Sequence, residues 1–364
     1  MKVTFLLPAF PRRPSGGHRV VYEYANHLVA RGHQVTAVHP QRLPKQMQDP
    51  PPPPPNLYRW LRGKGAQWRE RLLPYRITWQ TIDPRVEMAI IPDPSARYLP
   101  DADVVFATWW GTAEYVIDYP SCKGRKFYLV QDFGSYTGPE ERVRATWRLP
   151  FYKVTDSNWL YEQVCEAGGA PADTLNIPIA IDHQRFRLTA DVARRPKKVT
   201  MLYGTLGYKT PEVGIRALEI ARQRHPEVKV AVFGQKTFKP KNLPSWASYH
   251  SNISEKSLVA IYNSSLIFLC SSEAEGFALP PAEAMACGCA VVSTDCGGNR
   301  EYARHGETAL LSPPGDAEAL AANLLRVLED DGLRLRLALE GHKQIQAFTW
   351  ERSTNLLEEF IKSK

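Results

Sequence analysis

Residues 275–288 read EGFALPPAEAMACG, with two carboxylates, Glu275 and Glu283, on either side of a proline pair. Proline has no N–H to lose at the start of a helix, so the pair at 280–281 predicts that a helix begins there. Glu275 then lies on a loop and Glu283 in the first turn of the helix. A helix N-terminus attracts phosphate, and the backbone N–H groups of 277–279 lie beside it. The stretch therefore predicts an anion site flanked by two acceptors for hydroxyl groups.

The order strand, loop, helix, strand occurs twice, once at the start of the chain and again from residue 198. In each copy a run of apolar residues is followed by a loop and then by apolar residues at helical spacing. Strands joined in this way pair in parallel, and the loop after the first strand faces a ligand cleft. The two copies therefore predict two Rossmann-like domains that face each other. The expected elements are strand 3–7, loop 8–17, helix 20–29 and strand 34–38, and then strand 198–203, loop 204–211, helix 212–224 and strand 228–233.

Other short patterns add elements to these two units. Residues 155–157 are placed to cap a helix over 159–165, and Asp316 to cap a helix over 317–328. The segment 295–301 contains a glycine pair after a strand and is expected to open a helix, with Glu301 as a packing residue. Further strands are expected at 103–108, 125–130, 265–271 and 290–293.

Composition narrows the class of protein. A chain of 364 residues with 43% hydrophobic residues is that of a globular protein with two domains of ordinary size. The six cysteines lack the spacing of a zinc site, so no zinc site is expected. No apolar run approaches the length of a membrane span and no export signal is seen, so we expect a cytoplasmic protein with reduced thiols. The net charge of +8 indicates anionic partners, but the basic residues are spread out and no nucleic-acid motif accompanies them.

The stretch 275–288 resembles the signature of the family-four retaining glycosyltransferases, which have the GT-B fold. The family pattern reads E-G-F-G-L-P-x-x-E-A-M-A-x-G, and this chain departs from it at Ala278, where the family usually has glycine. The resemblance implies that Glu275 contacts the donor sugar and that Glu283 holds the ribose hydroxyls. It also implies that the residues between them line the donor site; they are Gly276, Phe277, Ala278 and Leu279.

The resemblance also implies a domain organisation of the α/β class. Residues 1–187 would form a Rossmann-like acceptor domain and 188–345 a Rossmann-like nucleotide-sugar donor domain. Residues 346–364 would form a C-terminal helix that crosses back to the first domain. The linker is expected over 185–197, which is polar. A narrower likeness, to the rhamnosyltransferase-like subgroup acting on bacterial surface glycans, rests on two stretches, ATWW at 107–110 and YLVQD at 128–132.

Three further positions are candidate site residues. Gly16 and Gly17 lie in the first strand-to-helix loop, where the absence of a Cβ lets a ligand approach the backbone. In the family such a pair lies near the donor diphosphate, and the alternative is a merely flexible loop. Gln131 stands where many members carry a histidine that contacts the donor sugar. Glutamine cannot titrate, which favours a positioning role over a general base; the alternative is a polar strand end.

Lys209 is the fourth candidate. The loop 204–209 reads GTLGYK and matches a family loop with an Arg and a Lys that neutralise the leaving diphosphate. Lys209 fits, whereas Thr205 replaces the Arg, so another cation has to contribute, because a departing diphosphate needs a cation or a metal. Candidates for that cation are Arg12, Arg13 and Arg300. The alternative is an ordinary surface lysine at 209.

An insertion in the first domain carries a proline run at 50–55 followed by a basic and aromatic segment at 57–73. Trp60 and Trp68 share a helical face with leucines, while arginines and a lysine supply positive charge. Such a segment is typical of a helix that lies on an anionic membrane. Gly63 and Gly65 weaken this interpretation, and an ordinary packed surface helix remains the alternative.

The resemblance implies a metal-independent, retaining hexosyltransferase without a cofactor. Its donor would be a UDP-, GDP- or dTDP-linked hexose or deoxyhexose. Its acceptor would be a glycan or a lipid-linked glycan in bacterial surface polysaccharide synthesis, with peripheral contact to an anionic membrane and no nucleic-acid partner. The alternatives are a catalytically inactive GT-B module that binds sugar, a GT-B nucleotide-sugar epimerase and an inverting GT-B enzyme. A nicotinamide dehydrogenase is disfavoured, because no G-x-G-x-x-G follows either strand.

Overall fold

The computed structural model describes residues 1–46, 75–131, 133, 138–235 and 237–364. The segment 57–73 and Asp132 lie outside the described residues. Contacts divide the chain into two compact units, Met1–Leu129 with Leu149–Tyr152, and Val130–Arg148 with Lys153–Lys364. No helix of the described residues has both the length and the apolar character needed to cross a membrane.

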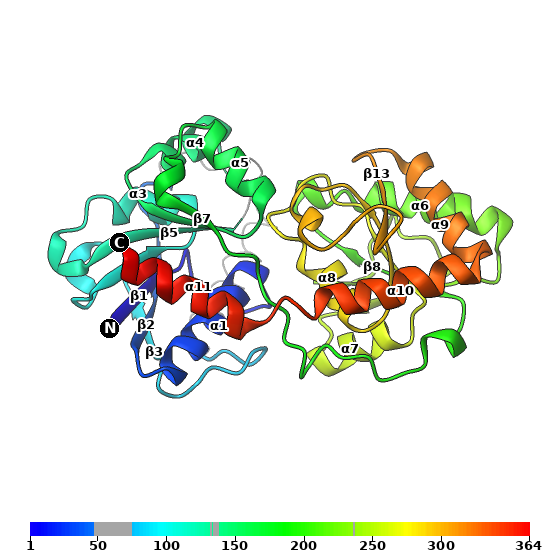
Figure 1. Ribbon diagram of the computed structural model, residues 1–364, viewed down its shortest axis with the longest axis horizontal. Coiled ribbons are helices and arrows are strands. Elements are labelled where there is room, and N and C mark those ends of the chain that lie inside the picture. The colour runs from blue at the N-terminus through cyan, green and yellow to red at the C-terminus, as the bar shows by residue number, and fades with distance from the viewer. Residues whose placement is uncertain (47–74, 132, 134–137, 236) are drawn as a thin grey trace, which may run out of the picture. The chain divides into compact units, whose positions relative to one another are not determined.

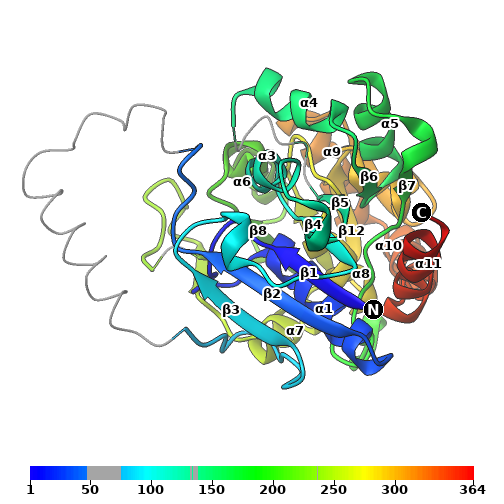
Figure 2. The same ribbon diagram turned by 90° about the vertical axis from the view of Figure 1, so that its left-hand side faces the viewer.

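The first sheet has seven strands in the order β3-β2-β1-β4-β5-β6-β7, and β3, β2 and β1 are seen side by side in Figure 2. β1 pairs in parallel with both β2 and β4, as the expected strand–helix–strand crossover requires. The strands are β1 Lys2–Leu6, β2 Gln34–Pro40, β3 Glu87–Ile91, β4 Val104–Ala107, β5 Arg125–Val130, β6 Tyr152–Thr155 and β7 Thr174–Asn176. The helices that connect them are α1 Gly16–Ala30, α3 Trp110–Val116, α4 Glu140–Arg148 and α5 Asn158–Glu166.

Three elements of the part of the chain that contains the first sheet agree with their sequence patterns. β1 is buried from Val3 onward, as expected for a continuous apolar strand in the middle of a parallel sheet. α1 ends before Gly32, which has a φ of +85°, a conformation that glycine adopts without strain. Ser157 accepts a hydrogen bond from the backbone N–H of Leu160 and caps α5, which confirms the cap expected at 155–157.

The second sheet has six parallel strands in the order β10-β9-β8-β11-β12-β13. Its strands are β8 Lys198–Tyr203, β9 Lys229–Gly234, β10 Ala247–Ser251, β11 Ile267–Cys270, β12 Ala290–Thr294 and β13 Ala309–Ser312. Its helices are α6 Pro211–Arg224, α7 Glu255–Asn263, α8 Leu279–Ala286, α9 Ala317–Glu329 and α10 Asp331–Ile345, and α11 Trp350–Ser363 follows. Figure 1 labels the strands β8 and β13 of this sheet and the helices α6, α7, α8, α9 and α10 of the same part of the chain. Asp316 accepts from the N–H of Ala319 and caps α9, as expected. The segment 295–301, in contrast, opens only a short 3-10 turn, Gly298–Glu301, so the helix expected there is wrong.

The central strands of the second sheet lie in a hydrophobic core between helices. Apolar side chains of the central strands, such as Val199 and Ile267, are fully buried and pack against Leu218 of α6 and Leu320 of α9. The strands β11 and β12 are buried at every position, as expected for parallel strands that are covered on both faces. The edge strand β10, with the sequence ASYHS, is only partly buried.

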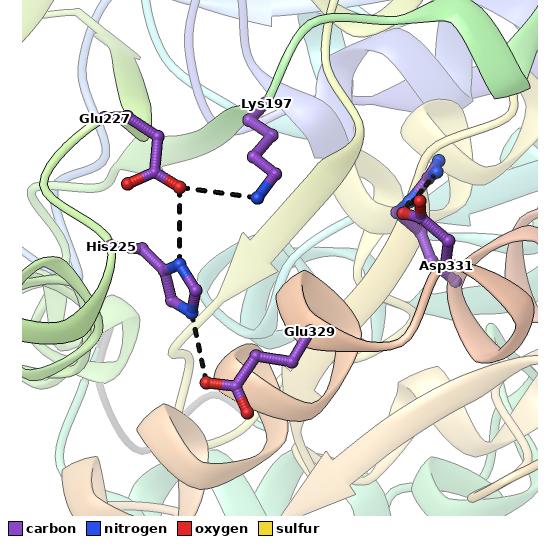
Figure 3. Close-up of polar contacts among 6 residues, drawn as sticks. Lys197, His225, Glu227, Glu329 and Asp331 are labelled. Carbon is purple, nitrogen blue, oxygen red and sulfur yellow. Dashed lines mark hydrogen bonds and ion pairs between the residues drawn. The ribbon is translucent and has the colours of Figure 1, made fainter.

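A polar cluster joins the starts of two strands to the end of α9 (Figure 3). His225 contacts Glu227 through Nδ1 at 3.3 Å and Glu329 through Nε2 at 3.0 Å, and Glu227 also accepts from Lys197 at 3.3 Å. Exposed pairs of this kind contribute about 0–1 kcal/mol each. We assign the cluster to the support of α6 and α9.

The polar linker at 185–197 is mostly exposed, but Phe186, Val192 and Arg195 within it are buried. Arg195 is buried, and its guanidinium donates to the carbonyl oxygens of Ser265 at 3.0 Å and Cys287 at 2.7 Å. Burial lowers the pKa of Arg195 from its usual value, but the backbone carbonyls satisfy the charged group. The linker therefore forms part of the packing of the second unit.

The C-terminal helix α11 begins after Thr349, whose hydroxyl accepts from the N–H of Arg352. Ser353 donates to the carbonyl oxygen of Pro178 at 2.8 Å, and Lys364 lies 3.1 Å from the carboxylate of Asp173. The helix thus contacts the chain on both sides of β7.

Candidate functional site

The loop between β11 and α8 carries Glu275, and its backbone is held in place by the neighbouring loop. The N–H of Glu275 donates to the carbonyl oxygen of Cys296 at 2.9 Å, and the N–H of Gly298 donates to the carbonyl oxygen of Glu275 at 3.1 Å. A Cβ at Gly298 would lie 2.1 Å from the carbonyl oxygen of Gly276. Only glycine allows this approach, which explains one residue of the pair in 295–301.

Glu275 forms a close ion pair with Lys209. The Nζ of Lys209 lies 2.5 Å from Oε1 of Glu275, and the two side chains are 15% and 10% exposed. Burial by itself lowers the pKa of Lys209, but the charge of Glu275 outweighs it and holds the pKa above its usual value. Lys209 is therefore a cation over the whole physiological range of pH. The alternative of an ordinary surface lysine is at odds with this burial and pairing.

The turn from β8 to α6 delivers Lys209 to this position. A Cβ at Gly204 would lie 2.3 Å from Cγ of Lys209, so the aliphatic stem of Lys209 occupies the space that glycine leaves. Thr210 donates through its hydroxyl to the carbonyl oxygen of Ser271, and Ser271 donates to that of Thr210 at 2.9 Å. Since β8 and β11 are neighbours in the sheet, this reciprocal pair ties the turn to the end of β11.

Helix α8 begins where the proline pair at 280–281 predicts a helix start. Leu279 is its first residue, followed by Pro280 and Pro281, and Ala278 is the capping residue. Ala278 has a φ of 65° and a ψ of 68°, and its carbonyl oxygen accepts from the hydroxyl of Tyr302 at 2.6 Å. The one departure from the family pattern therefore lies where the backbone needs the left-handed conformation that glycine adopts most readily.

Ala278→Gly is expected to leave the free energy of unfolding nearly unchanged, within about 0.5 kcal/mol. Relief of the left-handed alanine offsets the greater freedom of glycine in the unfolded chain and the loss of a buried methyl. Ala284→Gly is the matched control, because Ala284 is fully buried in the same helix, and it is expected to cost about 2 kcal/mol. Urea denaturation measures both, and equal losses in the two variants would contradict the strain at Ala278.

Phe277 and Glu283 are both buried. The ring of Phe277 contacts those of Tyr302 and Phe348, with centroids 5.3 and 5.9 Å apart, so this residue packs the loop against the body of the unit. Glu283 is 6% exposed and its Oε2 lies 3.4 Å from the hydroxyl of Tyr262. Glu275 and Glu283 thus stand on the loop and on the helix, as the sequence predicts.

The remaining candidates are placed as follows. Gly16 and Gly17 are the first residues of α1, in the unit that contains β1. Gln131 is half-buried and directly follows β5. Thr205 is exposed in the turn after β8. None of these placements tests a role in binding, which stays a prediction for each of them.

The candidates for the missing cation differ in their partners. Arg300 forms two hydrogen bonds with Asp295, at 2.7 and 2.9 Å, so its charge is already paired. The guanidinium of Arg12 lies 5.1 Å from the ring centre of Tyr75. Arg13 is exposed.

Glu301 serves packing, as expected from the sequence. Its carboxylate accepts from the N–H of Asn158, the first residue of α5, and from Asn176 at 3.3 Å. Burial raises its pKa, while the hydrogen bond from Asn158 opposes this shift.

Sequence reasoning missed a third partner of the ion pair, Ser272, whose hydroxyl donates to Oε1 of Glu275 at 2.6 Å. It also missed Cys270 and Cys296, which lie behind this group. A hydrogen bond from Cys296 lowers the pKa of Cys270 to about 7, and burial raises the pKa of Cys296. The serine pair at 271–272 was the only available signal, and serine pairs are too common to be informative.

The arrangement combines a fixed carboxylate that accepts hydrogen bonds with a cation that can neutralise an anion. Within the described residues, no group of three or more His, Cys, Asp or Glu side chains could hold a metal ion. The site therefore has the chemistry to bind a ligand that carries both hydroxyl groups and a negative charge.

Solved structures resemble this chain over its full length. The structure titled Anabaena Alr3699/HepE in complex with UDP and glucose has a TM-score of 0.74 with 15% identity, and the match covers 100% of both chains. The sucrose-phosphate synthase from Thermosynechococcus elongatus has a TM-score of 0.73 with 17% identity, covering 100% of this chain and 98% of the other. Together with the two parallel Rossmann-like sheets, these similarities define the GT-B fold.

Residues 188–344 match the model of the family described as glycosyl transferases group 1. A curated relative, the O-antigen biosynthesis protein RfbC of Myxococcus xanthus, is 28% identical over 262 residues, which are 70% of this chain and 20% of the relative. The phosphatidyl-myo-inositol mannosyltransferase of Mycobacterium tuberculosis is 28% identical over 193 residues, which are 49% of this chain and 51% of the relative. The chain thus spans about half or less of the length of these relatives.

Proposed function

We propose that this protein is a retaining glycosyltransferase that moves a hexose or deoxyhexose from a nucleotide-sugar to a glycan or lipid-linked acceptor. The observation that carries the proposal is the ion pair of Lys209 and Glu275, inside the segment that matches the group 1 family. The carboxylate would accept hydrogen bonds from the donor sugar, and the cation would stabilise the departing diphosphate. Retention would follow from attack on the face from which the diphosphate leaves.

The proposed pathway is the synthesis of a bacterial surface polysaccharide. Support comes from the names of two relatives, an O-antigen biosynthesis protein and a phosphatidyl-myo-inositol mannosyltransferase. The likeness to the rhamnosyltransferase-like subgroup favours a deoxyhexose donor. A donor linked to UDP, GDP or dTDP remains the proposal for the nucleotide.

The division of labour along the chain is also a proposal. Residues 1–187 would bind the acceptor and 188–345 the donor, with Gly16, Gly17 and Gln131 contributing to the site. The start of the family match at residue 188 supports this boundary. The contacts of α11 with Pro178 and Asp173 support a C-terminal helix that returns to the first domain.

The test is hydrolysis of UDP-glucose, GDP-mannose and dTDP-rhamnose in the absence of acceptor, followed by liquid chromatography. We expect slow release of one nucleoside diphosphate, and NMR of the sugar is expected to show the anomeric configuration of the donor at early times. An inactive sugar-binding module would bind one of these donors without releasing the diphosphate. An epimerase would release a sugar with an inverted ring carbon.

Activity is expected to survive a chelator. The charge of the leaving diphosphate would be met by Lys209 together with a second basic residue, so no divalent ion is expected to be required at this position. Hydrolysis rates in the presence of excess EDTA should match those without it. A complete loss that Mg²⁺ or Mn²⁺ restores would contradict the expectation.

Peripheral contact with an anionic membrane remains a proposal for the segment 57–73. Flotation with anionic and neutral vesicles at low and high salt tests it, since attraction to such a surface is screened beyond about 10 Å at 0.1 M salt. Flotation that is equal with both kinds of vesicle would favour a packed surface helix.

A further inference from the structure

The two oxygens of the Glu275 carboxylate are used differently. Oε1 receives both the Nζ of Lys209 at 2.5 Å and the hydroxyl of Ser272 at 2.6 Å. Oε2 accepts no hydrogen bond from the part of the chain that the structure describes. The carboxylate is therefore held through one oxygen, and the other is left for a ligand.

The direction of the hydrogen bond from Ser272 follows from its neighbours. An ionised carboxylate only accepts, so the hydroxyl hydrogen of Ser272 points to Glu275. The oxygen of that hydroxyl in turn lies 3.7 Å from the Sγ of Cys270, which donates to it. Ser272 thus has its donor committed to Glu275 and its acceptor committed to Cys270.

Ser272 is also rigidly held. It is 4% exposed at the end of β11, and its backbone carbonyl oxygen accepts from the hydroxyl of Thr294 at 2.5 Å. A buried side chain on a fixed backbone loses little entropy when it orients a neighbour, because its own geometry is already set.

We propose that Ser272 is a positioning residue that keeps Glu275 oriented when Lys209 turns to the anion. The inference rests on the proposed function, which requires Lys209 to serve a diphosphate as well as Glu275. In the unliganded pair both donors hold Oε1. Once a diphosphate draws the ammonium away, Ser272 is the remaining donor, and it presents Oε2 to the hydroxyls of the donor sugar.

The first test compares Ser272→Ala with Ser265→Ala. Ser265 is fully buried just before β11, and its hydroxyl donates to the carbonyl oxygen of Ile261 at 2.7 Å, so it is a matched serine at the other end of the strand. With the donor that wild type hydrolyses fastest among UDP-glucose, GDP-mannose and dTDP-rhamnose, Ser272→Ala is expected to lower kcat about tenfold and to change KM less than about threefold. Ser265→Ala is expected to leave both constants unchanged. Equal kinetics of the two variants would overturn the proposal.

A double-mutant cycle separates positioning from general destabilisation. If Ser272 acts only through the carboxylate, Ser272→Ala should change kcat by less than about twofold in a Glu275→Ala background. A structural role would give the same loss in both backgrounds, and that result would also overturn the proposal. If hydrolysis by Glu275→Ala falls below detection, the same cycle is measured on the Kd for that donor by calorimetry.

Donor binding and hydrolysis by the wild type distinguish a failure of the proposed function from a failure of the role of Ser272. A wild-type protein that neither binds nor hydrolyses any of the three donors would overturn the proposed function and this inference with it. An active wild type whose Ser272→Ala variant melts at the temperature of wild type and retains full kcat would overturn only the role of Ser272.

Discussion

Lys209→Ala is expected to lower kcat by about 10²–10³-fold, with a much smaller rise in KM. The ammonium lies 2.5 Å from Glu275 and is largely withdrawn from solvent, where a charge acts more strongly than in water. In the ground state part of its interaction is already used by Glu275. The negative charge on the leaving oxygen grows only in the transition state, so the loss falls on kcat more than on KM.

The measurement is steady-state donor hydrolysis by the wild type, Lys209→Ala and Lys229→Ala. Lys229 is exposed at the start of β9 and serves as the control for a general loss of positive charge. The stability of each variant is also measured by urea denaturation, because removal of one partner of a largely buried ion pair destabilises the fold as well. A Lys209→Ala variant with normal kcat would mean that the diphosphate is neutralised by another residue.

Glu283→Ala is expected to weaken donor binding by about 1–3 kcal/mol, which is roughly 5–150-fold in Kd. Glu283 is buried in α8 beside Tyr262, so a ligand hydroxyl that loses this acceptor inside the protein has no water to replace it. The effect is expected on binding more than on kcat, since the proposed ribose contact is the same in ground and transition states.

Calorimetric titration with the active donor measures this effect. Glu318→Ala is the control. Glu318 is exposed in the first turn of α9, and its replacement by alanine removes the same charge as Glu283→Ala. Glu283→Gln is informative as well, since an amide oxygen still accepts from Tyr262 and from one hydroxyl. Unchanged affinity in Glu283→Ala would exclude the ribose role.

The local elements could be predicted because their signals are local. Proline at 280–281 marks the start of α8, Asp316 caps α9, and Ser157 caps α5. Each signal depends on contacts within one turn of the chain. The segment 295–301 was mistaken for the start of a helix because its glycine pair is consistent with several turns, and the tight approach of Gly298 to Gly276 decides among them.

The sequence by itself determined the two parallel sheets, the helix that begins at the proline pair, and the presence of Glu275 and Lys209 among the candidates. Only the tertiary structure decided that these two form an ion pair, although they are 66 positions apart. The strand order places β8 beside β11, and this neighbourhood brings the turn after one to the loop after the other. The tertiary structure likewise decided the burial of Arg195 and the contact of Ser272 with Glu275. Strand order is selected by the packing of the whole core and not by short-range signals, so contacts that depend on it cannot be inferred from spacing along the chain.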